Sequence, residues 1–503
     1  MSRNLGFIRD MFIASYLGST FIADAFFVAF RIPNYFRRIF AEGAFSAAFI
    51  PIYSGIINNP KNQKENINFI ENTMSLLFFS LIVILIIFHF FMPYIIFFLA
   101  PGLIGNQDAY ELATHFGKII FPYLLFIALV AQFSSITNAY NKFAFGAFAP
   151  SLLNISLIGS LLFFSPYLST PGHSLSYGVI LGGIFQFILM YYALTKLNIR
   201  PFFVLPKIND NIKKFLKLFF PGILSSGAIQ LNIIVGTIIA SFLPTGAISH
   251  LYYADRLTQL PLGVFGIALG IALLPKLSTY IKTNANPEKI FNLQNRSIEF
   301  SIFISIPAVI GLVILSEPII SILFQRGAFT AMDTYYTSLI LIYFSLGLPA
   351  YILIKVLNPI FFSREDTKTP LYITLVSVLI NIILSIIFIK YFREIGIAIA
   401  TAISSWFNVI ILYFVLKMRN QIIMDHKCKT NIFKIIIASI LMLIALLFLK
   451  KIFFLQLMNG PISIRALLLL LNIGVSVTFF MILAFILKIY STENIKSILR
   501  KQE

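Results

Sequence analysis

The sequence predicts an all-α polytopic membrane protein with about fourteen transmembrane helices. Hydrophobic residues make up 59% of the 503 residues and charged residues 11%, whereas about 25% of an ordinary soluble protein is charged. Long runs carry no charge and reach the roughly 20 residues that a helix needs to cross a bilayer. The basic residues also alternate between crowded and sparse loops, as they do in membrane proteins. These observations exclude a soluble globular protein.

Gly, Pro and Asn at turns divide the apolar runs into single spans. The expected helices cover residues 1–20, 22–56, 70–100, 109–140, 146–165, 174–196, 211–242, 247–280, 291–325, 331–362, 369–391, 395–418, 431–455 and 464–489. The first is no cleavable signal peptide, because Arg3, Arg9 and Asp10 interrupt its apolar core. Arg3 can lie at membrane depth only if apolar residues precede it, so we expect coding sequence upstream of Met1.

The distribution of basic residues predicts the orientation. Loops after even-numbered helices, with the C-terminal tail, hold 24 of the 38 Lys and Arg residues, and loops after odd-numbered helices hold 7. The positive-inside rule therefore places both termini in the cytoplasm. The net charge of +19 has the same origin, because the bases are scattered between apolar runs and form no patch for nucleic acid.

An internal duplication indicates two lobes. GAFSAAFIPIYS at 43–54 resembles GIALGIALLPKLS at 266–278, and an Ala-Asp pair precedes each, at Asp24 and at Asp255. The offset spans six helices, so the halves share one orientation; the alternative is a chance likeness of apolar segments. We expect an N-terminal lobe at 1–200, a C-terminal lobe at 201–425, and a helix pair with a cytoplasmic tail at 426–503.

The second helix concentrates charge at membrane depth. It carries Asp24, Arg31, Arg37, Arg38 and Glu42. Asp24, Arg31 and Arg38 are seven residues apart and share one face, and Glu42 follows Arg38 at i+4, within pairing distance. Charged groups in a bilayer are costly and usually face a partner or an aqueous cavity. Pro33 in their midst permits a kink.

These charges suggest an anion site. If the lobes face each other, Arg3, Arg9, Arg37 and Arg256 converge on a central cavity, where guanidinium groups suit a pyrophosphate. Lys355 is expected to line the same cavity, with snorkelling to the interface as its alternative. Local pairing of Arg9 with Asp10, Arg38 with Glu42 and Arg256 with Asp255 is the other possibility. It is reasonable for Arg38, but as a whole it fails, because the intramembrane bases outnumber the acids and neighbours at i+1 point apart on a helix.

Other chemistry is weakly represented. The five histidines have no metal-ligand spacing, so we expect no metal site. The single cysteine, Cys428, excludes an internal disulfide and is expected in a basic polar loop. No nucleotide-binding motif is present. We therefore expect no cofactor, with sodium, protons or the membrane potential left open as the driving force.

The chain resembles the MurJ (MviN) family of lipid II flippases in the multidrug/oligosaccharidyl-lipid/polysaccharide exporter superfamily. The resemblance covers nearly the whole chain and is carried by SRNLGFIRD, ADAFFVAFRIPNYFRRIFAEGAFSAAFIPIYS, FAPSLLNISLIG, YYADRLTQLPLGVFGIALGIALLPKLS and FFSREDTKTP. It implies fourteen helices in two lobes about a cationic cavity, and a last helix pair lining a groove for a polyprenyl tail. It also implies that Arg3, Arg9, Arg37 and Arg256 are essential, with Asp24 in support. The chain departs from the family in beginning about a dozen residues later, and its eleventh helix offers Asn381 and Ser385 where some members have a sodium-site acid.

The resemblance implies export of lipid II across the bacterial cytoplasmic membrane by alternating access, in the service of peptidoglycan synthesis and cell shape. The expected partners are lipid II, membrane lipid and other proteins of peptidoglycan synthesis, with no nucleic acid. A flippase for another polyprenyl-linked glycan, or a drug antiporter of the same superfamily, is the close alternative. A membrane-embedded glycosyltransferase needs an acidic residue on a large outer loop, and the outer segment at 101–108 offers only Asp108. We therefore expect a transporter and no enzyme.

Overall fold

The computed structural model describes the backbone of residues 2–39, 45–57, 63–453 and 460–489, and their side chains except at 2–3, 38–39, 63–64 and 222–232. All regular structure in these ranges is helical. Each of the fourteen ranges expected from the sequence coincides with one helix or with consecutive helices. Eleven helices in the described part are long and apolar enough to cross a membrane. The predicted fold class is confirmed.

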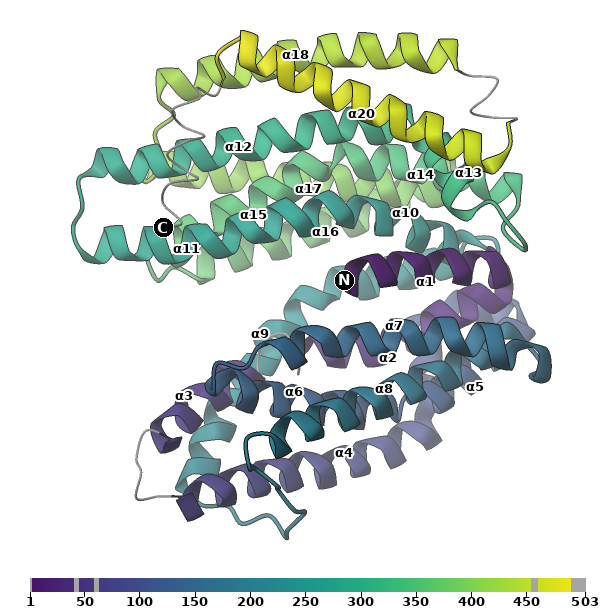
Figure 1. The fold of residues 1–503 in the computed structure, drawn as a ribbon, viewed down its shortest axis with the longest axis vertical. Coiled ribbons are helices and arrows are strands. Elements are labelled where there is room, and N and C mark those ends of the chain that lie inside the picture. Colours follow the sequence, from purple (N-terminus) through teal and green to yellow (C-terminus); the bar gives the residue numbers. More distant parts are fainter. Residues whose placement is uncertain (1, 40–44, 58–62, 454–459, 490–503) are drawn as a thin grey trace. The chain divides into compact units, whose positions relative to one another are not determined.

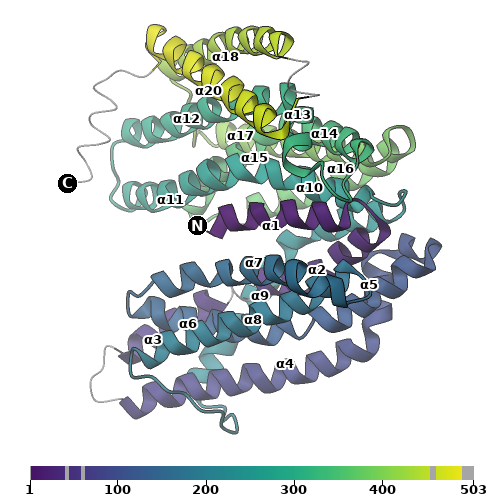
Figure 2. The same ribbon diagram turned by 45° about the vertical axis from the view of Figure 1, so that its right-hand side comes forward.

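The chain forms two compact units, and the first holds residues 1–249 with 326–330. Its helices are α1 (Ser2–Leu17), α2 (Phe21–Ile39), α3 (Phe45–Ile57), α4 (Gln63–Leu99), α5 (Gln107–Ile120), α6 (Tyr123–Ala139), α7 (Ala144–Phe164), α8 (Pro171–Thr195) and α9 (Asp210–Ser241). Helix α7 packs along α8 and α1, and α2 packs on α5 (Figure 2). Helix α9 packs on α2, α3 and α4.

The second unit holds residues 250–325 and 331–503. Its helices are α10 (Ala247–Pro261), of which residues 247–249 belong to the first unit, α11 (Ile267–Lys282), α12 (Pro287–Ile314), α13 (Ser316–Phe324), α14 (Ala331–Leu346), α15 (Leu348–Phe362), α16 (Lys368–Phe392), α17 (Glu394–Met418), α18 (His426–Ile452) and α20 (Ile462–Ile486). Helices α18 and α20 lie side by side, and α18 packs on α12 (Figure 1). The lobe limits expected from the duplication stay a prediction; by contacts, α9 groups with the helices before it.

Glycines allow neighbouring helices to pack closely, and side-chain caps mark where several helices begin. In α8, Gly178 and Gly182 are four residues apart and face α7. A Cβ added to Gly178 would lie 2.3 Å from the Ser160 Oγ, and one added to Gly182 would lie 2.7 Å from the Leu153 side chain. Small residues at this spacing let membrane helices approach closely. Side-chain oxygens accept a backbone N–H at the start of five helices, and the capping residues are Asn106, Thr170, Asn209, Asn286 and Asp425.

A polar network within the second unit joins α18 to α12. Glu299 on α12 is buried and accepts hydrogen bonds from Asn431 on α18, at 2.7 Å, and from Arg296. Arg296 also donates to Asp425 at 2.7 Å. Cys428 lies in the first turn of α18 and is fully buried, so its expected place in a polar loop was wrong. The residue folds inward because Asp425, three positions earlier, caps the helix.

A second ion pair fastens the turn between α15 and α16. Asp366 accepts hydrogen bonds from the Thr369 amide at 3.0 Å and from Arg419 at 2.7 Å. Burial acts to raise the pKa of Asp366, but the hydrogen bonds from Thr369 and Arg419 outweigh it and lower that pKa to about 2. This carboxylate therefore stays charged at neutral pH, as a turn in the expected cytoplasmic loop requires.

The orientation can be tested with one cysteine on each side. In a Cys428→Ser background, Leu205→Cys should resist an impermeant thiol reagent in intact cells, because the segment before α9 is expected in the cytoplasm. Leu205 is 82% exposed, so resistance to the reagent at this position would be due to the membrane barrier and not to burial in the protein.

Tyr167→Cys is the matched control, since Tyr167 is 86% exposed in the turn before α8, on the expected outer side. It should label rapidly without cell disruption. Labelling of Leu205→Cys with protection of Tyr167→Cys would reverse the topology.

Candidate functional site

Arg9 on α1 is buried and held by partners on two helices. Its guanidinium donates to Asp10 Oδ1 through Nε at 3.0 Å and Nη2 at 2.6 Å, and to Asn154 Oδ1 on α7 at 3.0 Å. The expectation that neighbours at i+1 cannot pair was wrong here. The arginine side chain is long enough to fold back to an adjacent short carboxylate. Arg9 thus fastens α1 to α7 in this structure.

Asp24 on α2 is buried and binds the start of α10. Its carboxylate accepts hydrogen bonds from the Gly246 amide at 2.6 Å, the Ser249 amide at 2.9 Å and the Ser249 hydroxyl at 2.6 Å. The first amides of a helix have no partner within the helix, and a helix N-terminus favours negative charge. Asp24 therefore caps α10 from another helix.

The basic residues of α2 divide between two roles. Arg31 donates to the Thr237 hydroxyl on α9, and the Tyr35 hydroxyl lies 3.5 Å from the same oxygen. Arg37, one turn beyond Pro33, is half-buried, and its Nε donates to Asn34 Oδ1 at 3.3 Å. The helix continues through Pro33, and Asn34 donates to the Phe30 carbonyl at 2.9 Å near that residue. Arg31 thus connects α2 to α9, and Arg37 has a hydrogen bond within α2.

Arg256 occupies the middle of α10. Its guanidinium lies 4.5 Å from the centroid of the Tyr252 ring, one turn earlier, in a cation–π contact. Asp255 accepts a hydrogen bond from Gln259. Pro261 ends α10, and a π-helical turn at Leu262–Gly266 links it to α11. Such turns are rare and occur often at functional sites.

The remaining predicted site residues are placed less closely. Lys355 is exposed on α15, where Gly270 of α11 packs on its backbone, with a Cβ position 3.0 Å from the Lys355 carbonyl oxygen. The side chains of Arg3, Arg38 and Glu42 lie outside the described residues. Arg9, Asp24 and Arg37 belong to the first unit and Arg256 to the second. Convergence of the arginines on one cavity stays a prediction.

Sequence reasoning missed the neutral partners of these charges. Asn154, Thr237 and Ser249 bind Arg9, Arg31 and Asp24 respectively. All three are polar residues inside apolar runs, which was the available signal. The pairing itself could not be read from the sequence, because the partners are 145, 206 and 225 residues apart.

The eleventh span offers an uncharged polar cluster. Ser385 donates to Asn381 Oδ1 at 3.0 Å, and the Asn381 amide donates to Thr401 on α17 at 3.3 Å. Asn381 and Ser385 are buried. No group of three acidic, His or Cys side chains in the described part of the chain could hold a metal ion. The cluster connects α16 and α17 by hydrogen bonds.

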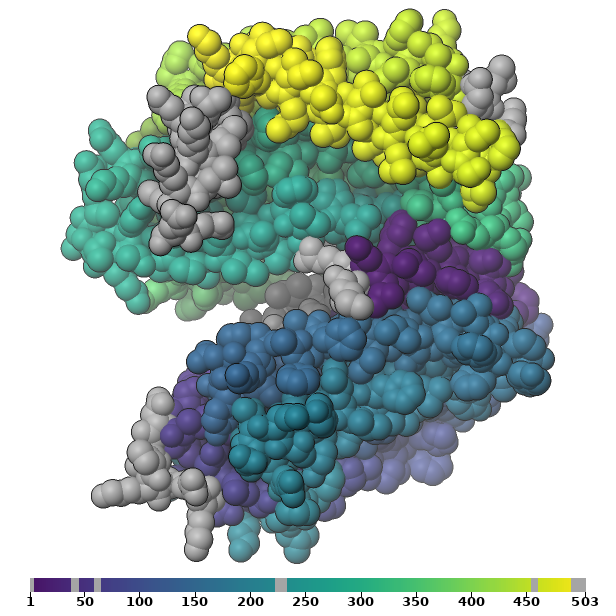
Figure 3. All heavy atoms as spheres, viewed as in Figure 1, coloured from purple at the N-terminus to yellow at the C-terminus, as the bar shows by residue number. Residues whose placement is uncertain are grey.

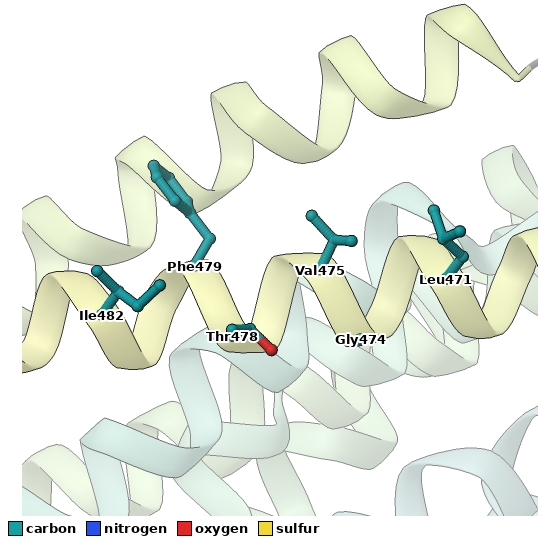
Figure 4. A pocket seen from close by; sticks show the side chains of 6 residues that line it. All are labelled: Leu471, Gly474, Val475, Thr478, Phe479 and Ile482. Carbon is teal, nitrogen blue, oxygen red and sulfur yellow. The ribbon is translucent and has the colours of Figure 1, made fainter.

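An apolar groove of about 510 Å³ runs along α20. Leu471, Val475, Phe479 and Ile482 project from the helix, with Gly474 and Thr478 between them (Figure 4). Helix α20 lies at the surface of the second unit (Figure 3). The lining residues all come from α20, and the groove is open at the surface.

The two arginines of the first unit should differ in their effect on stability. Arg9→Ala removes a buried charge that binds Asp10 and Asn154, so the free energy of unfolding should fall by about 3 to 5 kcal/mol. Arg37→Ala removes a half-buried charge that bonds to Asn34 in the same helix, and should change stability by less than about 1 kcal/mol. Thermal unfolding of the purified variants measures the difference, and equal losses would contradict this division of roles.

Comparison with known proteins identifies the family. The family model described as "Lipid II flippase MurJ" matches residues 13–483. A "Probable lipid II flippase MurJ" of Rickettsia prowazekii is 37% identical over 497 residues, covering 98% of this chain and 96% of that protein. Another from Buchnera aphidicola subsp. Baizongia pistaciae is 39% identical over 90% of this chain and 87% of that protein.

Solved structures agree with this likeness. "Lipid II flippase MurJ, inward closed conformation" is similar with a TM-score of 0.81 and 31% identity, covering 96% of both chains. A multidrug transporter of the MATE family in an inward-facing conformation has a TM-score of 0.68 at 17% identity, covering 83% of this chain and 94% of that one, and shares the fold alone. From a family match across nearly the whole length and relatives above 30% identity, this chain belongs to the MurJ family of lipid II flippases.

Proposed function

We propose that this protein exports lipid II across the bacterial cytoplasmic membrane by alternating access. The observation that carries the proposal is the family match over residues 13–483 together with arginines at membrane depth. Lipid II carries a pyrophosphate, and guanidinium groups bind phosphate through paired, charge-assisted hydrogen bonds. The headgroup crosses in a cavity between the lobes while its tail remains in lipid.

Arg37 and Arg256 are the strongest candidates for headgroup binding. Both are half-buried, Arg37 bonded to Asn34 and Arg256 in contact with the Tyr252 ring. Each side chain therefore keeps a surface that a ligand can reach. Arg9 differs, because its Nε and both Nη groups already donate to Asp10 and Asn154. We assign Arg9 a positioning role for α1, and Arg3 a binding role that rests on the family resemblance alone.

Asp24 is proposed to close the outer side. The expected topology places the starts of α2 and α10 at the outer surface, since the turns before them follow odd-numbered helices. The contacts of Asp24 with Gly246 and Ser249 join these two starts. Breaking these hydrogen bonds would release the first turn of α10. The Asp24 carboxylate would therefore hold the outer side closed, and loss of its hydrogen bonds would let that side open.

The groove on α20 is proposed to hold part of the polyprenyl tail. Its described lining is apolar apart from Thr478, so it offers no polar group that would compete for a headgroup. A tail lying there would stay in a hydrocarbon environment while the headgroup moves through the protein. The same arrangement serves a flippase for another polyprenyl-linked glycan, which is the second candidate.

Reconstituted vesicles test the function. Purified protein should move labelled lipid II across the bilayer, and a polyprenyl-linked glycan with a different sugar should be moved at least about tenfold more slowly. Equal rates would favour the broader glycan flippase. Transport of neither substrate, with efflux of cationic drugs, would favour the antiporter.

Replacing Arg37 or Arg256 by Ala should abolish lipid II export while the protein remains folded. Each loses a charge-assisted hydrogen bond to phosphate worth about 1.5 to 3 kcal/mol, a loss of roughly 10- to 150-fold in affinity. Arg37→Lys keeps the charge but not the planar fork, so it should lie between wild type and Ala.

The control for these variants is Arg31→Ala, since Arg31 contacts Thr237 on α9. It should lower thermal stability more than lipid II affinity. Binding of labelled lipid II, membrane abundance and thermal unfolding separate the two effects. Normal export by Arg37→Ala and Arg256→Ala would show that these arginines do not bind the headgroup.

Asp24→Asn should weaken the outer closure. The amide cannot accept all the hydrogen bonds that the carboxylate accepts, and it loses the charge that favours a helix N-terminus by about 0.3 to 2 kcal/mol. We expect at least about a tenfold loss of export. Ser249→Ala removes only the hydroxyl and should lose less, as measured by lipid II externalisation; equal or greater loss in Ser249→Ala would contradict a role for the carboxylate.

A further inference from the structure

A histidine in the second unit lies between two carboxylates from different helices. His250 on α10 has its Nε2 3.2 Å from Asp333 Oδ1 on α14 and its Nδ1 3.5 Å from Glu394 Oε1 on α17. The three side chains are 7%, 15% and 7% exposed. Nothing in the headgroup site or in the closure by Asp24 uses this cluster.

The geometry suits an imidazolium ion better than a neutral ring. A neutral imidazole has one N–H and can donate to only one carboxylate, while the other nitrogen presents a lone pair. In the structure the buried Nδ1 lies 3.5 Å from Glu394 Oε1 without a hydrogen bond, and Nε2 lies 3.2 Å from Asp333 Oδ1. With a second proton, both nitrogens become donors, and one faces each carboxylate.

The surrounding groups favour ionised carboxylates on both sides of the ring. Asp333 lies in the first turn of α14 and Glu394 is the first residue of α17, where helix dipoles stabilise the ionised carboxylates. The Tyr336 ring stacks on His250 with centroids 5.7 Å apart. Arg393, which precedes Glu394, interacts electrostatically with that carboxylate. Within the described residues the three side chains do not form a metal site.

We propose that His250, Asp333 and Glu394 form a proton-binding site, in which an imidazolium bridges the two carboxylates and ties α10 to α14 and α17. The expected topology places this site on the outer side, near the starts of the three helices. Release of the proton leaves two carboxylates around a neutral ring and loosens the first turns of α10. His250 directly follows Ser249, which binds Asp24.

The site links outer pH to the export cycle, a step that rests on the proposed function. Acid outside would hold α10 in place and delay the opening of the outer side. Histidine in its ordinary state changes charge between about pH 5 and 8, so outer pH is the variable that tests this link.

The titration of His250 tests the site without any substrate. In protein labelled with carbon-13 at histidine and reconstituted in nanodiscs, one ring signal should vanish in His250→Gln. That signal should change from imidazolium to neutral imidazole as pH rises, with a midpoint that moves in Asp333→Asn and in Glu394→Gln. A ring that stays neutral, stays charged throughout, or titrates unchanged in both variants would overturn the proposal.

His426→Gln is the matched control, because His426 is exposed at the start of α18. It should leave the His250 signal unchanged. If His250→Gln fails to fold, Glu394→Gln and Asp333→Asn replace it in the test, because both keep the His250 ring. The His250 signal is then identified as the one whose midpoint moves in both variants.

Export at varied outer pH tests the consequence. Wild-type protein should externalise lipid II about fivefold more slowly at acid than at alkaline outer pH, and His250→Gln should show little dependence. A normal titration of His250 with no export of lipid II at any pH would contradict the proposed function and leave the proton site standing. Equal pH dependence in wild type and His250→Gln would remove the link to export.

Discussion

The hydrogen bonds from the first turn of α10 to the Asp24 carboxylate are the contact on which the functional part of the structure depends. A carboxylate inside an apolar protein is costly unless it is bound, and a helix N-terminus has amides without partners. The carboxylate accepts hydrogen bonds from the Gly246 and Ser249 amides, so the charge gains donors and the amides gain an acceptor. Because α10 also carries His250, Asp255 and Arg256, this single contact fixes the start of the helix on which several functional charges stand.

The need of a buried charge for a bonding partner also distinguishes the roles of the other charges. Three arginines bind a partner on another element. Arg9 bonds to Asn154, Arg31 to Thr237 and Arg296 to Asp425. These bases therefore hold the scaffold, and their removal would leave polar partners without their bonds. Arg37 and Arg256 are half-buried, and each has a contact one turn away, with Asn34 and with the Tyr252 ring. A partly exposed base can meet a ligand, which is the physical basis for proposing that both bind substrate.

The architecture also separates polar chemistry from hydrocarbon. Several charged residues of the second unit gather in the network around Glu299 and in the cluster around His250. The groove on α20 is lined almost entirely by carbon. An amphiphile with a charged head and a long tail needs both environments in one protein, and it needs them apart, so that the tail never crosses a polar region.

The sequence by itself determined the helices, because an apolar run of about 20 residues in a membrane can satisfy its backbone only within itself. The charges of α2, and Arg256, were therefore recognised as exceptional without coordinates. The tertiary structure decided which of them are bound. Asp24 meets Ser249 across 225 residues and Arg9 meets Asn154 across 145, and no local pattern encodes contacts at that range. It also overturned a local rule: Arg9 pairs with adjacent Asp10, since packing against α7 selects a side-chain conformation that helix geometry alone disfavours.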